Sequence, residues 1–180
     1  MKTKNDLLEF HAALKVAETL EGESEDIVKF LYGVDRNIAK TESEVKSIAK
    51  AKEFLPDYLK YDKERIALCE EMAKKDGKGR ALKVLKDKKL MYDLFDKDGD
   101  YKKSFITALE KLNEKHKKAL DNRTKQLKKY DEMLEEDMEF DTKDLYMVPR
   151  NTIPKDVAGK KTGEAKKRLF KLLLPMIVEE

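Results

Sequence analysis

Apolar side chains recur at heptad spacing through much of the first half of the chain. The intervals between them alternate between four and three residues, and this repeat predicts α-helices that pack as a left-handed coiled coil. We therefore expect a long helix over residues 25–75. Pro56 removes one backbone hydrogen bond, so it predicts either a kink there or a restart with proline in the first turn. The positions are Ile27, Leu31, Val34, Ile38, Thr41, Val45, Ile48, Lys52, Leu55, Leu59, Asp62, Ile66, Cys69 and Ala73.

A shorter amphipathic segment precedes this repeat. Residues 5–21 place leucines, Phe10 and Ala17 on one stripe, which predicts a short helix. Gly22 is a suitable stop for it. Ser24, followed by Glu25 and Asp26, is typical of an N-cap for the next helix.

A second long helix is expected over residues 101–137. Its apolar stripe shifts period once near 116–120, and His116 is expected to pack along it. The two long helices, separated by a connector over residues 80–100, predict a mainly α fold built on a long antiparallel coiled-coil helical hairpin. The sequence leaves open whether the coiled coil forms within one chain or between chains. The stripe residues are Phe105, Leu109, Leu112, Leu120, Leu127, Tyr130 and Leu134.

The connector and the tail carry shorter elements. Two apolar runs around a charged turn in residues 81–95 predict a small β-hairpin, although a helix also fits them. Residues 138–180 predict a strand-like segment up to 148, a loop and a basic helix over 164–174 that Pro175 stops. The apolar end of the chain should dock on the first helix, so that the short terminal helices pack at the base of a single domain, 1–180.

Composition favours solvated helices. Charged residues make up 43% of the chain and hydrophobic residues 40%, and the apolar periodicity argues against the competing interpretation, disorder. Cys69 is the single cysteine, so no internal disulfide can form, which suits a reducing cytosol. No run approaches the roughly 20 apolar residues of a membrane span. We therefore expect no membrane association.

Charge is segregated along the chain. Residues 72–130 hold 19 Lys and Arg against 9 Asp and Glu, whereas residues 131–144 hold 8 acids and a single lysine. This distribution indicates a basic and an acidic patch, although solvated helix faces would give the same pattern. The expected partner-binding residues lie where the first long helix meets the connector and where the connector meets the second: Lys74, Lys75, Lys78, Arg80, Lys102 and Lys103.

One stretch, Leu94–Asp100, has aspartates at three positions of a calcium-binding EF-hand loop. Such a loop requires glycine at its sixth position and glutamate at its twelfth, where this chain has Tyr101 and Thr107. The stretch instead predicts a turn in which Asp98 or Asp100 caps the following helix. Cys69 and His116 are expected to pack, so we predict no catalytic residue, no metal site and no cofactor.

Several segments resemble a family of small, uncharacterised helical proteins encoded by phages and mobile elements of low-GC Gram-positive bacteria. The resemblance rests on a helix that ends in a Lys-Asp-x-x-Gly turn, a short β-like insert, an acidic end to the return helix and a short apolar C-terminus. It implies an accessory role but transfers no catalytic residue. The segments are ERIALCEEMAKKDGKG (64–79), LEKLNEKHKK (109–118), QLKKYDEMLEEDMEFDTKDL (126–145) and Leu172 to Val178.

The expected function is binding rather than catalysis. The leading hypothesis is an accessory protein that binds a protein partner, for example as an inhibitor of host defence such as an anti-CRISPR protein that blocks a nuclease. The first alternative is nucleic-acid binding through the basic segment 72–130. The second is a self-associating virion or assembly component.

Overall fold

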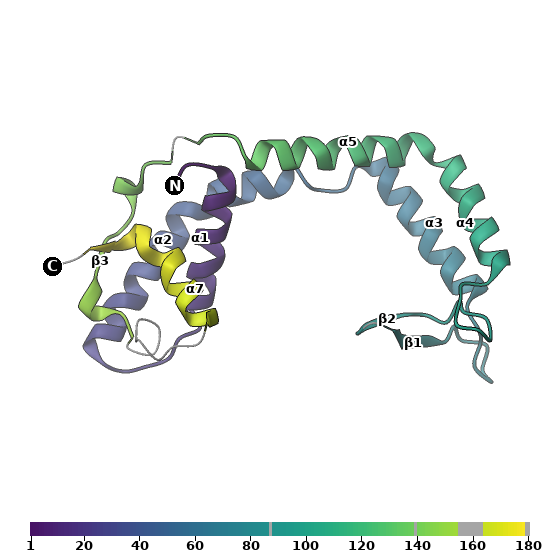
Figure 1. The fold of residues 1–180 in the computed structure, drawn as a ribbon, viewed down its shortest axis with the longest axis horizontal. Helices are drawn as coiled ribbons and strands as arrows, with labels where there is room; N and C mark the ends of the chain where they lie inside the picture. The colour runs from purple at the N-terminus through teal and green to yellow at the C-terminus, as the bar shows by residue number, and fades with distance from the viewer. Residues whose placement is uncertain (87, 139, 155–163, 179–180) are drawn as a thin grey trace. The chain divides into compact units, whose positions relative to one another are not determined.

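The computed structural model describes residues 1–86, 88–138, 140–154 and 164–178. The fold is mainly helical with a small antiparallel two-stranded sheet, as predicted (Figure 1). The chain forms two compact units: unit 1 comprises residues 1–52 and 129–180, and unit 2 comprises residues 53–128. The predicted single domain stays a prediction, and each unit is described by itself. In chain order the elements are α1 (Lys4–Ala17), α2 (Glu25–Lys50), α3 (Pro56–Met72), β1 (Lys83–Lys86), β2 (Lys89–Tyr92), α4 (Lys103–Lys115), α5 (Lys117–Leu134), η1 (Thr142–Asp144), β3 (Val148–Pro149), η2 (Arg150–Thr152), α7 (Glu164–Leu173), η3 (Leu174–Met176) and β4 (Ile177–Val178).

The first two helices begin at well-formed caps. Thr3 and Asp6 form a reciprocal capping box at the start of α1. The hydroxyl of Ser24 accepts a hydrogen bond from the amide of Ile27 at the start of α2, which confirms its predicted role as N-cap. The predicted helix over 5–21 is shorter at its end, because α1 stops at Ala17 and Thr19 closes a turn onto the carbonyl of Val16.

The core of unit 1 lies between α1, α2, α7 and the segments around β3 and β4. In Figure 1, α1, α2 and α7 lie together in this unit. The heptad stripe of α2 is buried here against α1, and the apolar end of the chain docks on the same helices, as expected. Among the described residues, the fully buried apolar side chains of this core are Phe10, Leu14, Ala17, Phe30, Val34, Val148, Leu173 and Met176.

The long helix expected over 25–75 is interrupted. Helix α2 ends at Lys50, and α3 restarts with Pro56 at its first helical positions and Leu55 as N-cap, without a side-chain capping bond. Proline suits the first turn because that turn needs no backbone N–H donor. Of the two predicted outcomes, the restart is therefore the one observed.

The expected return helix, 101–137, is also divided. Helix α4 begins at Lys103 and ends before His116, whose φ of −109° and ψ of 19° leave the helical region, and α5 ends at Leu134. The break coincides with the predicted shift of the apolar period near 116–120. His116 is packed, as predicted: its ring lies edge-on to Tyr61 with 5.7 Å between centroids.

In unit 2, α3 and α4 lie side by side and antiparallel. Near one end Lys102 Nζ donates to the carbonyl of Met72 at 3.2 Å, and further along the hydroxyl of Tyr61 donates to Asn113 at 2.9 Å. Between these contacts lies a small core formed by Cys69, Ala73, Leu94 and Phe105.

The predicted β-hairpin is confirmed. Strands β1 and β2 pair antiparallel, with Lys83 opposite Tyr92 and Leu85 opposite Leu90. Lys88, at the turn, has a φ of 61°. This left-handed conformation suits a tight hairpin turn between twisted strands.

The tail differs from its prediction. Residues 138–148 are predicted to be strand-like, but Thr142–Asp144 form a 3-10 turn, and among the residues described in this segment strand pairing begins at Val148, where Val148–Pro149 pair in parallel with Ile177–Val178. Asp141 explains the turn, since its carboxylate accepts from the amide of Lys143 at 2.9 Å and so competes with strand pairing. The helix predicted over 164–174 is confirmed as α7. Most of the predicted loop, residues 155–163, lies outside the described residues.

Candidate binding groove

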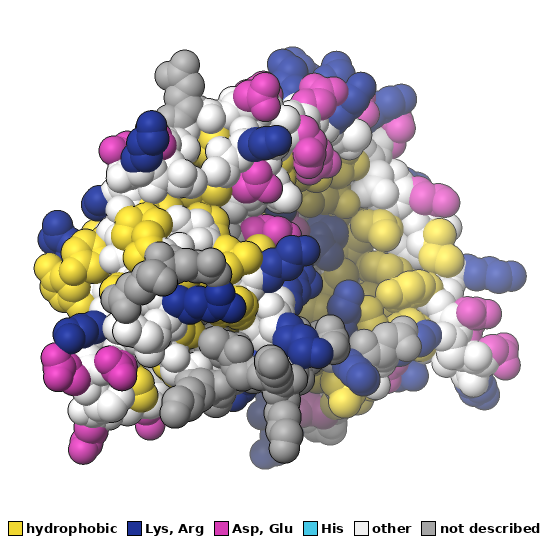
Figure 2. Space-filling model, turned by 60° about the vertical axis from the view of Figure 1, so that its left-hand side comes forward, with side chains coloured by type: hydrophobic (Ala, Val, Ile, Leu, Met, Phe, Trp, Pro, Cys, Tyr) yellow, Lys and Arg dark blue, Asp and Glu magenta, His cyan; other side chains and the backbone are white. Residues whose placement is uncertain are grey.

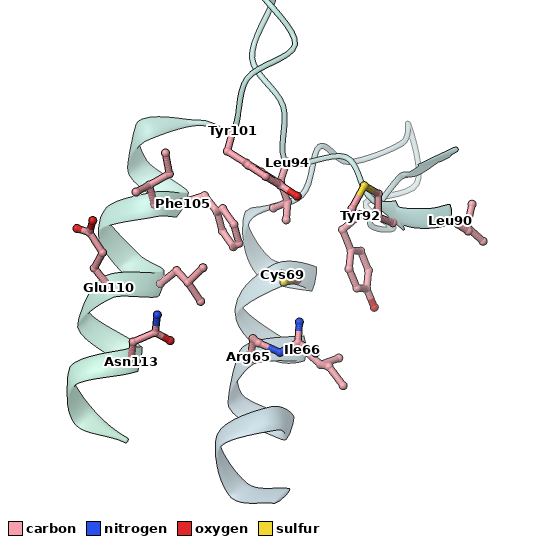
Figure 3. Close-up of a pocket in the computed structure, with 13 residues that line it drawn as sticks. Arg65, Ile66, Cys69, Leu90, Tyr92, Leu94, Tyr101, Phe105, Glu110 and Asn113 are labelled. Atoms are coloured by element: carbon pink, nitrogen blue, oxygen red, sulfur yellow. The ribbon is translucent and has the colours of Figure 1, made fainter. Parts of the chain in front are cut away.

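A mostly apolar pocket of about 480 Å³ opens on unit 2 between α3, α4 and the hairpin; we call it the groove. Figure 3 shows side chains of α3 and α4 lining it, with Tyr101 and Leu94 at one end and Arg65 and Asn113 towards the other. A concave site of this size and character is a common kind of binding site. The groove is lined by Arg65, Ile66, Cys69, Leu90, Met91, Tyr92, Leu94, Tyr101, Phe105, Ile106, Leu109, Glu110 and Asn113.

Large apolar side chains of the groove remain exposed. Ile66 of α3 is 41% exposed, Ile106 of α4 is 43% exposed and Leu90 of β2 is 68% exposed. Leu85, the cross-strand neighbour of Leu90, is 74% exposed. Figure 2 shows that hydrophobic side chains lie among Lys, Arg, Asp and Glu side chains on the face of the molecule that it presents. Exposed apolar side chains gathered around a pocket, rather than scattered singly, indicate an interaction site.

Two polar side chains at the margin of the groove, those of Arg65 and Tyr92, already have partners. Arg65 Nη2 lies 2.7 Å from Asp62 Oδ1, and this carboxylate raises the pKa of Arg65. The hydroxyl of Tyr92 donates to Glu70 at 2.6 Å, a bond that raises the pKa of Tyr92. These bonds hold the walls in place and leave the apolar surface as the part available to a ligand.

Cys69 does not give the groove a nucleophile. Its side chain is 7% exposed, and burial raises the pKa of its thiol. Because the thiolate is the reactive form, a raised pKa makes this cysteine inert near neutral pH. The prediction that Cys69 packs as a small buried residue is confirmed.

A second groove between α3 and α4 offers an internal comparison. It has a volume of about 410 Å³ and combines Ala67, Leu68, Ala108 and Leu112 with charged residues. Lys115 Nζ forms an ion pair with Glu64 there at 2.7 Å. Its apolar residues are smaller or better covered than those of the first groove, so it serves as a control surface.

Two matching turns flank the hairpin. The carboxylate of Asp76 accepts from the amides of Lys78 and Arg80, both at 2.8 Å, and the amide of Asp76 donates to the carbonyl of Arg80. Twenty residues later in the sequence, Asp96 makes the same bonds with Asp98 and Asp100. The fourth residue of each turn is a glycine with positive φ, Gly79 and Gly99. The calcium-loop-like stretch is therefore one member of a pair of structural turns.

The expected capping by Asp98 or Asp100 is wrong. The N-cap of α4 is Lys102, and this cap has no side-chain hydrogen bond. The isolated bridge between Phe95 and Tyr101 closes the turn two residues before α4 starts, so its aspartates bond within the turn. In the described part of the chain, no group of three His, Cys, Asp or Glu side chains is arranged to hold a metal ion.

The six predicted partner-binding residues lie near the two turns, and four of their side chains have partners within unit 2. Lys74 pairs with Asp93 at 3.1 Å, and Arg80 pairs with Asp76 at 2.8 Å. Lys75 donates to the carbonyl of Glu70, and Lys102 donates to that of Met72. Lys78 and Lys103 are exposed, and among the described residues their ammonium groups form no ion pair. A partner-binding role for the six stays a prediction.

Comparison with known protein families, curated proteins and solved structures finds no match for the chain. None of the described helices is both long enough and apolar enough to cross a bilayer.

The groove residues Ile66, Leu90 and Ile106 were not singled out as a site from the sequence. The sequence places Ile66 on the heptad stripe and Leu90 in an apolar run of the connector, but Ile106 is not among the stripe residues of the second helix. The three residues belong to elements that are distant in sequence. Only the packing of α4 beside α3, with the hairpin at one end, brings them to one pocket. The usable signal was an excess of apolar positions over what a two-helix pair can bury.

Proposed function

We propose that the chain acts by binding a protein partner rather than by catalysis, and that the groove of unit 2 receives this partner. The observation that carries the proposal is the convergence of exposed Ile66, Leu90 and Ile106 on one concave apolar site. Protein interfaces combine such an apolar centre with a polar rim. Burying these side chains on a partner would remove their apolar surface from water.

Charge supports an acidic partner. The hairpin carries Lys83, Lys86, Lys88 and Lys89 beside the groove. The ammonium groups of Lys83 and Lys86 lie over the rings of Tyr92 and Phe95, at 4.9 and 4.1 Å from the ring centroids. These stacked lysines keep their charge at the surface, where it steers acidic surfaces towards the site.

Two finer features belong to the same proposal. The antiparallel coiled-coil geometry is supported over α3 and α4 by the contacts from Met72–Lys102 to Tyr61–Asn113. A phage or mobile-element origin, with action in the bacterial cytoplasm, is supported by the sequence resemblance. One concrete form is inhibition of a CRISPR nuclease, which a DNA-cleavage assay with added protein tests directly.

Nucleic-acid binding is the second candidate. The observation that favours it is lysines at helical spacing within each of two helices: Lys111 and Lys115 on α4, and Lys118 and Lys125 on α5. However, Lys115 is already paired with Glu64. These lysines also offer no explanation for the exposed apolar side chains of the groove.

Site-specific photocrosslinking tests the proposal. A photoreactive amino acid replaces Ile106 in the groove, and a matched variant carries it at the exposed Ala67 of the second groove. In bacterial cells, we expect a defined protein adduct at position 106 and none at position 67. Equal labelling at both positions, or adducts only with nucleic acid, would contradict the proposal.

A further inference from the structure

We infer that the groove takes an amphipathic α-helix with acidic flanks, which packs beside α3 and α4 as a third helix. The inference rests on the proposed function and specifies the partner's structure. Two antiparallel helices present parallel ridges of side chains, and the groove between such ridges fits the ridge of another helix.

The heptad stripe of α3 is only partly used within the chain. Cys69 and Ala73 are buried on α4 and the connector, whereas Leu59 and Ile66, on the same stripe, are 43% and 41% exposed. Stripe residues contact α4 at the end of α3, whereas nearer its start the contact is made beside the stripe by Tyr61, which bonds to Asn113. A heptad position left exposed is typical of a helix that lacks one of its partners.

Helix α4 contributes the matching wall. Ile106, Leu109 and Asn113 recur at three- and four-residue spacing and line the same groove. Figure 3 shows α3 and α4 side by side along the groove. Both walls are therefore helical and follow the 3.6-residue period that an incoming helix shares. A flat bilayer surface cannot enter such a concave site.

Charge selects among helical occupants. Residues 53–128 hold 21 Lys and Arg against 15 Asp and Glu, and the hairpin beside the groove carries Lys83, Lys86, Lys88 and Lys89. In the lining itself Arg65 is paired with Asp62 and Glu110 is exposed, so the basic surface that flanks the groove is that of the hairpin. Two copies of this basic unit repel each other, so charge disfavours a second copy of the chain as the occupant. A partner helix with glutamate or aspartate beside its apolar stripe is attracted to the same surface.

The probe for this inference is a labelled synthetic helix of about three heptads, with leucine at the core positions and glutamate at the flanking positions. Fluorescence anisotropy measures its binding to the full chain. We expect it to bind about tenfold more tightly than a scrambled peptide of equal composition or a peptide with lysine in place of glutamate. Ile66→Glu and Ile106→Glu should each weaken binding about tenfold, and Ala67→Glu should not.

Circular dichroism checks that each variant keeps its helical content, and a less polar pair, Ile66→Ala and Ile106→Ala, replaces any variant that unfolds. Equal binding of all three peptides, or no effect of the groove substitutions, would overturn the inference. A concentration-dependent dimer lost in Ile66→Glu would overturn it in favour of a second copy. If the peptide fails while the natural partner still crosslinks at position 106, the helical inference fails alone. If the peptide does not bind and no partner crosslinks at position 106, the proposed function is contradicted as well.

Discussion

At the scale of single residues, Asn37 joins two parts of unit 1. Its side chain is fully buried on α2, where Nδ2 donates to the carbonyl of Tyr146 at 2.9 Å and Oδ1 accepts from the amide of Tyr146 at 2.7 Å. The side-chain amide thus satisfies both backbone groups of one residue in the segment before β3. A polar side chain at an interior position is here required by the backbone that it contacts.

Replacing Asn37 therefore has a defined cost. Asn37→Ala leaves the N–H and C=O of Tyr146 without these partners, and we expect it to lower the free energy of unfolding by about 2 to 4 kcal/mol. Urea unfolding followed by circular dichroism measures the change. The exposed Ser47→Ala on the same helix is the control and should stay within about 0.5 kcal/mol of the wild type. An equally small effect of Asn37→Ala would contradict the assigned role.

Gly33 is required for close packing. A Cβ atom at this position would lie 2.2 Å from Cγ2 of the buried Val148. Alanine normally stabilises a helix interior by about 1 kcal/mol relative to glycine. We expect Gly33→Ala to have the opposite effect and to lower the free energy of unfolding by about 1 to 3 kcal/mol, because β3 must move away from α2.

Gly77→Ala is the matched control for Gly33→Ala. No atom lies within 4 Å of a Cβ built at Gly77. Thermal unfolding followed by circular dichroism measures both variants, and Gly77→Ala should be neutral or slightly stabilising. If both alanines act alike, the close approach of Val148 to α2 is not what requires glycine at position 33.

At the scale of elements, the paired turns around the hairpin depend on one aspartate each. We expect Asp76→Ala to increase hydrogen exchange at the amides of Lys78 and Arg80, and Asp96→Ala to do so at those of Asp98 and Asp100, by about tenfold. NMR-detected exchange measures this directly. Asp98→Ala is the control, since the turn uses the main-chain amide of Asp98. Added calcium should leave these rates unchanged, and protection by calcium would revive a metal-binding role.

A partly buried histidine between α1 and α2 predicts that the stability of the fold depends on pH. Nδ1 of His11 lies 2.7 Å from the Thr41 hydroxyl, which itself donates to the carbonyl of Asn37 at 2.8 Å, so the ring nitrogen donates. Burial lowers the pKa of His11 below its ordinary 6.5. The unfolded chain therefore binds a proton at His11 more readily, and stability falls as pH drops through about 6.5.

We expect the urea midpoint to decrease between pH 7.5 and pH 5.5. In His11→Gln, which keeps a donor towards Thr41 without a titrating group, the decrease should be smaller. Asp6 adds no comparable effect in this range, because hydrogen bonds from the amides of Lys2 and Thr3 lower its pKa below an ordinary value of 3.8. If the urea midpoint of His11→Gln decreases as much as that of the wild type, His11 does not cause the pH dependence.

The elements also show what the sequence could predict. Ser24 as a cap, the hairpin within residues 81–95 and the basic helix near the end of the chain follow from local patterns, and all three are confirmed. The apolar pattern does not show which helix packs against each stripe, because that depends on tertiary packing. The stripe of α2 is buried by α1, and that of α3 is left half exposed at Leu59 and Ile66. The groove was missed for the same reason, since it arises from packing between distant segments.

At the scale of the whole molecule, the two units differ in their surfaces. Unit 1 holds the acidic segment 131–144, and unit 2 holds most of the basic segment 72–130 and the apolar groove. Unit 1 buries the apolar end of the chain in its core, whereas unit 2 leaves large apolar side chains around a pocket. The proposed binding therefore belongs to unit 2, whereas unit 1 packs the N-terminal and C-terminal helices into one core.

Hydrogen exchange of the full chain, alone and with the partner identified by crosslinking, tests this assignment most directly. We predict slower exchange on binding in α3, β2 and α4, which line the groove, and unchanged exchange in α1 and α2. Slower exchange confined to unit 1, or along α5 without protection of the groove, would contradict the account.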